Sequence, residues 1–158
     1  MKVAKVAGVV QSFFWKSDGY RDPEIDLEIN TGGVSAGKWT EDWIEGQGFG
    51  RAYFTVLSKS PNIQFMIELP FNPADAFHRY GWLWTPGSIR FTIDGQEVAS
   101  LDHLPEGLNG TRADAPRGYI MANIWSGYSD WGGGHPTVNA TVQYDWMKFY
   151  SGATSIIG

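Results

Sequence analysis

The chain has 158 residues, a length that fits one domain and supplies enough chain for a buried core. Its hydrophobic content of 42% excludes a disordered chain, and its charged content of 18% is below the roughly 25% of an average domain. A net charge of −5 without a run of Lys or Arg excludes the basic face that nucleic-acid binding needs. Because the chain has no cysteine, disulfides and thiolate metal sites are also excluded.

The first residues resemble an export signal only in part. Lys2 and Lys5 precede an apolar run, but that run is uninterrupted only over residues 6–10, short of the roughly 7–15 residues that such a signal needs. No apolar stretch approaches the ~20 residues of a membrane span. We therefore expect no signal peptide in this chain and no membrane partner.

Short alternating runs of apolar and polar residues follow one another along the chain, separated by clusters of Gly, Pro, Asn and Asp. They predict strands at residues 6–15, 24–29, 51–57, 63–69, 80–85, 88–93, 96–100, 119–125 and 141–150. Asp94-Gly95 predicts a hairpin with a type I′ turn, because Gly accepts the positive φ that this turn needs. Residues 72–77 predict one helical turn with Asn72 as its cap. Many short strands with almost no helix favour one antiparallel β-sandwich or barrel.

The segment at residues 23–29, Pro-Glu-Ile-Asp-Leu-Glu-Ile, is the most informative one for chemistry. In a strand its side chains alternate, so Glu24, Asp26 and Glu28 share one face and three aliphatic side chains share the other. Like charges this close disfavour joint ionisation, so at least one of the carboxyl groups should have a raised pKa. One protonated and one ionised carboxyl at the same pH are what acid–base catalysis requires.

Two other interpretations of this segment stay open. A helix could begin with Asp22 as its N-cap, but Asn-Thr-Gly-Gly at residues 30–33 would end it after about seven residues, and Asp26 would leave the face of Glu24 and Glu28. The acids could instead form the solvated face of an antiparallel strand, although stacked like charges destabilise such a face.

The spacing of the two glutamates offers a geometric check. Residues four apart on a strand have Cα atoms roughly 13 Å apart, at ~3.3 Å per residue. Retaining glycosidases hold two carboxyl groups about 5–5.5 Å apart, and inverting ones about 6.5–9.5 Å. Glutamate side chains that lean together on the concave face of a bent sheet would close much of the gap, so the residue types fit this chemistry.

Glu-Ile-Asp-Leu-Glu at residues 24–28 resembles the E-x-D-x-E signature of family 16 glycoside hydrolases, in the uninterrupted form of the lichenase and xyloglucan-transferase branch. Further blocks resemble the family in the same order along the chain. Residues 77–95 resemble its F-H-x-Y-x-x-x-W-x-P-x-x-I-x-x-x-x-D-G block, residues 120–127 its I-M-x-N-x-W-x-G strand and residues 144–150 its last strand. The resemblance covers roughly residues 3–150, and its specificity comes from several blocks in the right order.

This resemblance implies a concanavalin A-like jelly roll, an all-β antiparallel sandwich, formed as one catalytic domain by residues 1–158. It implies a secreted enzyme without a cofactor that cleaves β-glucan or a related polysaccharide with retention. By position in the motif, Glu24 would be the nucleophile and Glu28 the general acid/base, with Asp26 tuning their protonation. A transglycosylase on the same scaffold, or an inactive, lectin-like carbohydrate-binding fragment, are the alternatives.

The resemblance also implies substrate-binding residues. Asn123 and Trp125 fall where the family places cleft residues, and alternation puts both on one strand face. Tyr128 and Trp131 are looser candidates for the cleft rim. Trp15 could face either the substrate or the core, and we count it among the binding candidates. Tryptophan rings stack on the apolar faces of sugars, and an amide can bond their hydroxyls.

The other tryptophans and the histidines have structural interpretations. Trp82, Trp84 and Trp146 alternate within predicted strands and are expected to pack in the core or on the sheets. His78 is expected to be structural. Because His103 and His135 lack a second ligand at a suitable spacing, we expect no metal site.

The chain also departs from the family pattern. Lichenases tend to have Trp-Asp before the motif, where this chain has Asp22-Pro23, and Phe54 stands near the place of an expected amide side chain. The family's N-terminal strands have no counterpart, so we expect a domain that is incomplete at its N-terminus. Exposed sheet edges would follow, and these invite pairing with another chain.

Overall fold

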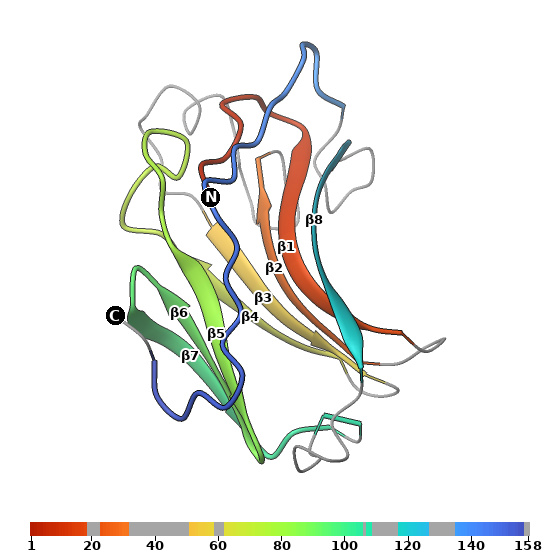
Figure 1. Ribbon diagram of the computed structural model, residues 1–158. Helices are drawn as coiled ribbons and strands as arrows, with labels where there is room; N and C mark the ends of the chain where they lie inside the picture. Colours follow the sequence, from red (N-terminus) through yellow and green to blue (C-terminus); the bar gives the residue numbers. More distant parts are fainter. Residues whose placement is uncertain are drawn as a thin grey trace.

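The computed structural model describes residues 1–18, 23–31, 51–58, 62–105, 107–108, 117–126 and 135–156. Within these residues, the strands in chain order are β1 (Val9–Ser17), β2 (Glu24–Asn30), β3 (Arg51–Leu57), β4 (Ile63–Glu68), β5 (Tyr80–Thr85), β6 (Ser88–Ile93), β7 (Gln96–Asp102) and β8 (Gly118–Ser126). They form a five-stranded sheet in the order β4-β3-β2-β1-β8 and a three-stranded sheet in the order β5-β6-β7 (Figure 1). Every pairing is antiparallel. In this part of the chain, no helix has the length and apolar character to cross a membrane.

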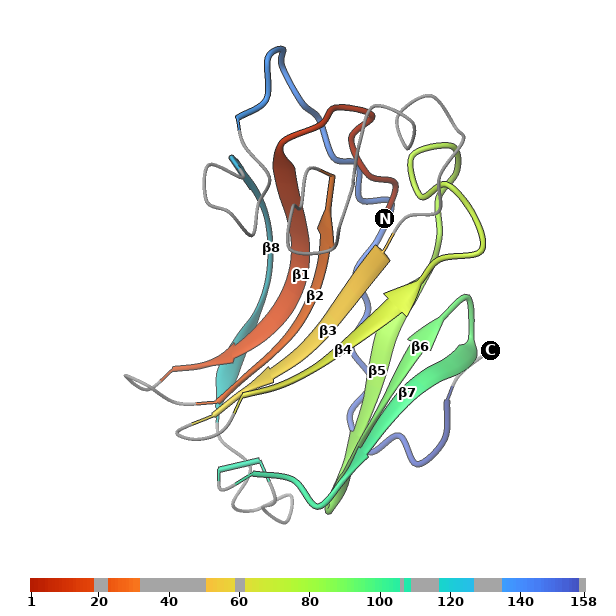
Figure 2. The ribbon, with the colours of Figure 1, turned by 180° about the vertical axis from the view of Figure 1, so that it is seen from behind.

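The two sheets pack face to face as a sandwich. The five-stranded sheet is strongly bent, and the three-stranded sheet lies behind its convex face (Figures 1 and 2). Fully buried aliphatic side chains of β2, Ile25, Leu27 and Ile29, belong to the core between the sheets. Phe54 of β3 reaches Phe91 of β6, with ring centroids 4.8 Å apart. The expected antiparallel all-β sandwich is therefore confirmed, and its second, concave face carries the polar side chains of the bent sheet.

The predicted hairpin is present between β6 and β7. Asp94 has a φ of 50° and Gly95 a φ of 81°, as a two-residue type I′ turn requires. The predicted helical turn at residues 72–77 is a capped turn rather than a helix. Asn72 accepts a hydrogen bond from the Ala74 backbone N–H at its side-chain oxygen (3.0 Å), and its carbonyl accepts another from Asp75 (3.1 Å).

The strand predicted at residues 141–150 is wrong. Only an isolated bridge joins Gln143 to Lys2 there, with N···O distances of 2.8 and 2.9 Å. A strand forms only where a neighbouring strand offers a continuous row of partners, and the described chain offers one residue. Trp146, expected to pack on a sheet, is 47% exposed and lies beneath the Lys148 ammonium, 4.7 Å from its ring centroid. The expectation that Trp146 packs on a sheet is therefore wrong, because residues 141–150 do not form a strand of either sheet.

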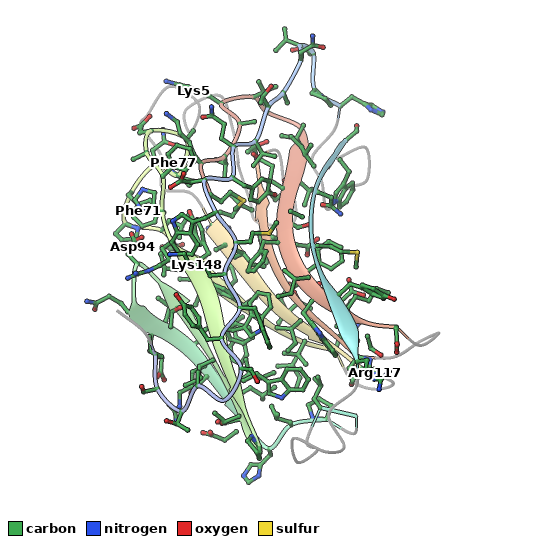
Figure 3. The ribbon with its side chains drawn as sticks, viewed as in Figure 1. Lys5, Phe71, Phe77, Asp94, Arg117 and Lys148 are labelled. Carbon is green, nitrogen blue, oxygen red and sulfur yellow. The ribbon has the colours of Figure 1, made fainter. Side chains whose placement is uncertain are left out.

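The remaining structural expectations hold for Trp82, Trp84 and His78. The two tryptophans pack against the core from β5. The ring of His78 stacks on Phe71 with centroids 3.5 Å apart, and its Nδ1 is 2.8 Å from the Asp94 carboxylate. Phe71 and Asp94 lie on the side of the small sheet (Figure 3). His78 therefore joins the loop before β5 to the β6–β7 turn, as a structural residue.

Candidate active site

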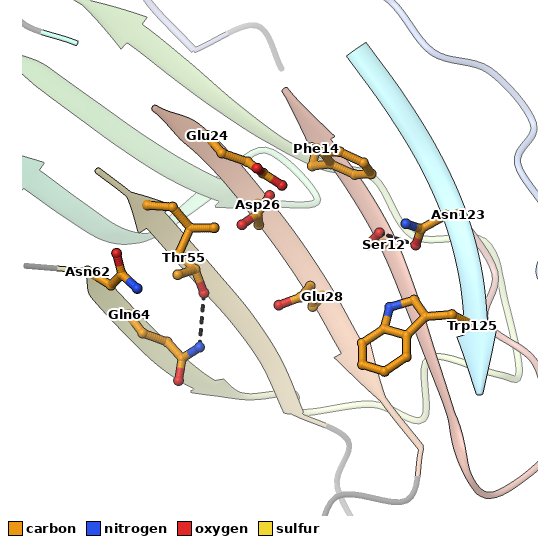
Figure 4. Close-up of a pocket in the computed structure, with 11 residues that line it drawn as sticks. Ser12, Phe14, Glu24, Asp26, Glu28, Thr55, Asn62, Gln64, Asn123 and Trp125 are labelled. Carbon is orange, nitrogen blue, oxygen red and sulfur yellow. Dashed lines mark hydrogen bonds between the residues drawn. The ribbon is translucent and has the colours of Figure 1, made fainter. Parts of the chain in front are cut away.

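The three acids of β2 lie on the concave face of the bent sheet. Glu24, Asp26 and Glu28 are alternate residues of a regular strand, and their neighbours Ile25 and Leu27 are fully buried in the core. The strand interpretation of this segment is thus confirmed, and the helical one is wrong. Figure 4 shows the three carboxyl groups following one another along the same face of β2.

A pocket of about 440 Å³ surrounds these acids, a size within the range of small-molecule sites. Five neighbouring strands or their flanks contribute its lining: Ser12, Phe14, Glu24, Asp26, Glu28, Thr55, Leu57, Asn62, Gln64, Asn123 and Trp125. The structure therefore brings together the three acids, Asn123 and Trp125, five of the residues expected from the sequence. Trp125 and the β4 residues lie on opposite sides of the row of acids (Figure 4).

The acids differ in their protonation. Burial, and then the negative charges of Glu24 and Glu28, raise the pKa of Asp26 to about 9. Burial also raises the pKa of Glu28 to about 7, again with help from the charge of Glu24. Glu24 is ion-paired with Lys16 of β1. At neutral pH the row therefore holds a protonated Asp26 and a Glu28 that can both give and take a proton, which is the protonation pattern required for acid–base chemistry.

Two hydrogen bonds order the polar side chains on the walls. The Ser12 hydroxyl donates to Asn123 Oδ1 at 2.5 Å, between β1 and β8. On the other side, the Gln64 amide donates to the Thr55 hydroxyl at 3.0 Å, between β4 and β3 (Figure 4). Both walls therefore present amide groups in fixed orientations, which can bond sugar hydroxyls.

Sequence reasoning missed six pocket residues, Ser12, Phe14, Thr55, Leu57, Asn62 and Gln64. Strand alternation carried a signal for some of them, since Phe54 is fully buried in the core and its neighbour Thr55 must then face the acids. The side chain of Phe54 therefore does not stand in the pocket at the place where an amide was expected. The amide groups on this side of the pocket come instead from Asn62 and Gln64.

Trp15 is the one described candidate that the structure places elsewhere. It is buried in the core, and its ring centroid is 4.9 Å from that of Trp84 in an edge contact. Phe13 and Trp15 of β1 contact tryptophans of the small sheet, whereas Ser12 and Phe14 line the pocket. The expectation that Trp15 binds substrate is therefore wrong. Tyr128 and Trp131 lie outside the described residues.

The described residues include no group of three His, Cys, Asp or Glu side chains arranged to hold a metal ion. His135, one of the histidines considered for metal binding, has its Nδ1 3.0 Å from the Ser126 hydroxyl.

The profile of Glycosyl hydrolases family 16 matches residues 1–148. The chain belongs to this family. Among its relatives is the "Beta-glucanase" of Bacillus amyloliquefaciens, 32% identical over 155 residues that cover 94% of this chain and 56% of the relative. The family 16 chain thus spans about half the length of the curated relatives it matches.

Solved structures agree with this assignment. The β-glucanase of Bacillus licheniformis superposes with a TM-score of 0.63 at 26% identity, covering 88% of this chain and 57% of the other. A β-1,3-1,4-glucanase (lichenase) derived from a mouse hindgut metagenome gives a TM-score of 0.61 at 26% identity, over 85% and 55% of the two chains. The resemblance to the lichenase-like branch and the jelly-roll sandwich are therefore both confirmed for this family 16 chain.

Proposed function

We propose that this family 16 chain belongs to a glycoside hydrolase that cleaves β-glucan with retention of configuration. The observation that carries the proposal is the row of three carboxyl groups on the floor of one pocket, with protonation states that differ along the row. Relatives named β-glucanase support the substrate class.

The proposed mechanism gives each acid a separate role. In the first step a carboxylate oxygen of Glu24 attacks the anomeric carbon, and the bond from that carbon to the leaving oxygen breaks. The electron pair goes to that oxygen, which takes the proton of Glu28. In the second step Glu28 accepts a proton from water, the water oxygen bonds to the anomeric carbon, and Glu24 is released as a carboxylate. Asp26, protonated between the two, donates a hydrogen bond to Glu24.

The proposed substrate path crosses the five-stranded sheet over the acids. Trp125 offers an aromatic face on the β8 side, where a pyranose ring can stack, and Asn123 lies beside it. Asn62 and Gln64 offer amides on the β4 side. A polysaccharide strand that contacts both walls would hold one glycosidic bond above Glu24 and Glu28, the geometry that proximity catalysis requires.

The deciding experiment compares the chain with Glu24→Gln on mixed-linkage 1,3/1,4-β-glucan, laminarin and xyloglucan, measuring new reducing ends. We expect activity in the parent and a loss of at least about 10³-fold in the variant, since the nucleophile is removed. Glu97→Gln, an exposed acid on β7, is the matched control and should keep full activity. A change in the length of the polysaccharide without new reducing ends would instead indicate a transglycosylase. Binding of the polysaccharide with neither new reducing ends nor a change in its length would indicate a lectin-like fragment. Equal activity in parent and Glu24→Gln would overturn the proposed roles.

A further inference from the structure

A lysine lies beside the row of acids and has no role in the proposed mechanism. Lys16 of β1 lies directly opposite Glu24 of β2 in the strand register, and its ammonium forms an ion pair with Glu24 Oε2. The side chain of Glu24 is only 17% exposed, and that of Lys16 is 42% exposed. Because the backbone register places both side chains on the concave face, this pairing follows from the sheet itself.

The pair makes the row of acids electrostatically asymmetric. Lys16 is opposite the first acid, so its charge acts most strongly on Glu24 and least on Glu28, four residues along the strand. Asp26, between them, can donate its proton in a strong hydrogen bond to an ionised neighbour. A positive charge at the Glu24 end therefore makes Glu24 the acid of the row whose negative charge is best compensated.

We propose that Lys16 is a positioning residue that holds the Glu24 carboxyl group through their ion pair and thereby decides which acid of the row is the nucleophile and which is the proton donor. This inference rests on the proposed function for its consequence in catalysis. Its electrostatic part, however, concerns the acids themselves and can be measured without any turnover.

The groups that face Glu24 and its row are few within the described residues. β3 places Leu57, Thr55 and Tyr53 opposite the three acids, β1 places Lys16, Phe14 and Ser12 opposite them, and β8 places Tyr119 opposite Lys16. The β4 side adds the amides of Asn62 and Gln64. Among these side chains Lys16 carries the positive charge, and it is the cation whose field also lowers the pKa of Asp26 against the effect of burial.

The test uses three variants of the whole chain. Lys16→Met removes the charge and keeps the length of the side chain, whereas Lys16→Arg keeps the charge. Lys5→Met changes the net charge by the same amount but far from Lys16. Lys5 and Arg117 lie at opposite ends of the molecule (Figure 3). Arg117 directly precedes β8, in which Tyr119 lies opposite Lys16. Amide NMR spectra first establish that each variant is folded.

The first measurement is the titration of the side-chain carboxyl carbons, labelled with ¹³C, at low salt. We expect the titration midpoint of Asp26, whose pKa the charge of Lys16 lowers, to rise in Lys16→Met, to return in Lys16→Arg, and to stay in place in Lys5→Met. The second measurement is kcat/KM on β-glucan, which should fall in Lys16→Met, return in Lys16→Arg and stay unchanged in Lys5→Met.

The outcomes separate this inference from the proposed function. Unchanged carboxyl titration in Lys16→Met overturns the role of Lys16 whether or not the chain is active. An equal shift in Lys5→Met also overturns it, because the effect would then belong to net charge. A shifted titration in a chain without hydrolytic activity supports the role of Lys16 in ordering the acids and counts against the proposed function alone.

Discussion

Ser12 and Asn123 lie directly opposite each other across β1 and β8, and the Ser12 hydroxyl donates a hydrogen bond of 2.5 Å to Asn123 Oδ1. This bond engages the oxygen of the amide and leaves its two N–H groups as the hydrogen-bond donors (Figure 4). An amide held in this way is pre-oriented as a donor toward a ligand in the pocket, and less entropy is lost when the ligand binds.

Loss of this amide should weaken substrate binding. Asn123→Ala should raise KM for β-glucan about fivefold, because one net hydrogen bond to a ligand is worth about 1 kcal/mol. Ser12→Ala should raise KM less, about threefold, because the amide remains but can rotate. Steady-state kinetics measure both values. Asn139→Ala, at an exposed asparagine outside the pocket, is the control, and an equal effect there would count against the prediction.

Glu28 should titrate lower when Glu24 loses its charge. Burial, and then the charge of Glu24, raise the pKa of Glu28 to about 7. In Glu24→Gln the second cause is absent, so the Glu28 carboxyl should ionise at a lower pH, by about half a unit to one unit, although burial still holds it above its ordinary value. Carboxyl ¹³C titration measures this in the variant without activity. An unchanged Glu28 midpoint would show that the two acids are not coupled.

Asp26 should make the folded protein less stable as pH rises. Its pKa is about 9 in the folded state and 3.8 as its ordinary value, because burial and then the charges of Glu24 and Glu28 disfavour ionisation. Between these values the folded chain binds more protons than the unfolded chain, so the free energy of unfolding falls from about pH 4 to pH 9. Asp26→Asn cannot ionise, so it should flatten this slope.

At pH 8 we expect Asp26→Asn to be more stable than the parent by roughly 1–2 kcal/mol, while its activity falls, a common trade between stability and function. Urea unfolding at several pH values measures the slope. Asp102→Asn, at an exposed aspartate that ends β7, should leave it unchanged. A parent whose stability rises over this pH range would refute the prediction.

The faces of β2 were predictable because its two faces differ in chemistry. Aliphatic and acidic residues alternate from Glu24 onward, and a one-residue shift would bury three carboxyl groups. The strands at 51–57 and 80–85 were predicted with the observed bounds for a related reason, since turn residues flank runs rich in β-branched and aromatic side chains.

The buried face of β1 could not be predicted from its sequence. Phe13 and Trp15 pack against tryptophans of β5, whereas Phe14, between them, lines the pocket. Because aromatic residues occupy both faces, alternation separates the two sets but does not say which set is buried. The assignment needs the position of β5, which follows only from the assembled sandwich.

Pocket residues on β3 and β4 were missed for a different reason. Thr55 and Gln64 meet because β3 and β4 pair in one particular register, and Thr55 lies opposite Asp26 because β2 pairs with the other edge of β3. Strand order in a sheet is a non-local property, since the partners are far apart in the chain. The same dependence explains residues 141–150, whose alternating pattern is typical of a strand but whose partners are missing from the described chain.

β8 should mediate self-association of the chain. It is nine residues long, carries no charged residue, and within the described residues pairs only with β1, so one of its edges is open. Tyr119 is 63% exposed, and Ile120 and Ile124 are 37% exposed, whereas charged side chains commonly protect natural edges. We expect the sedimentation coefficient to rise with protein concentration, and Ile124→Lys to suppress this rise because it places a charge on the edge. Val138→Lys adds the same charge at an exposed residue outside the strands and should not suppress it. A parent that sediments as a monomer at every concentration would contradict this prediction, because an open apolar edge of this length should pair when concentration favours it.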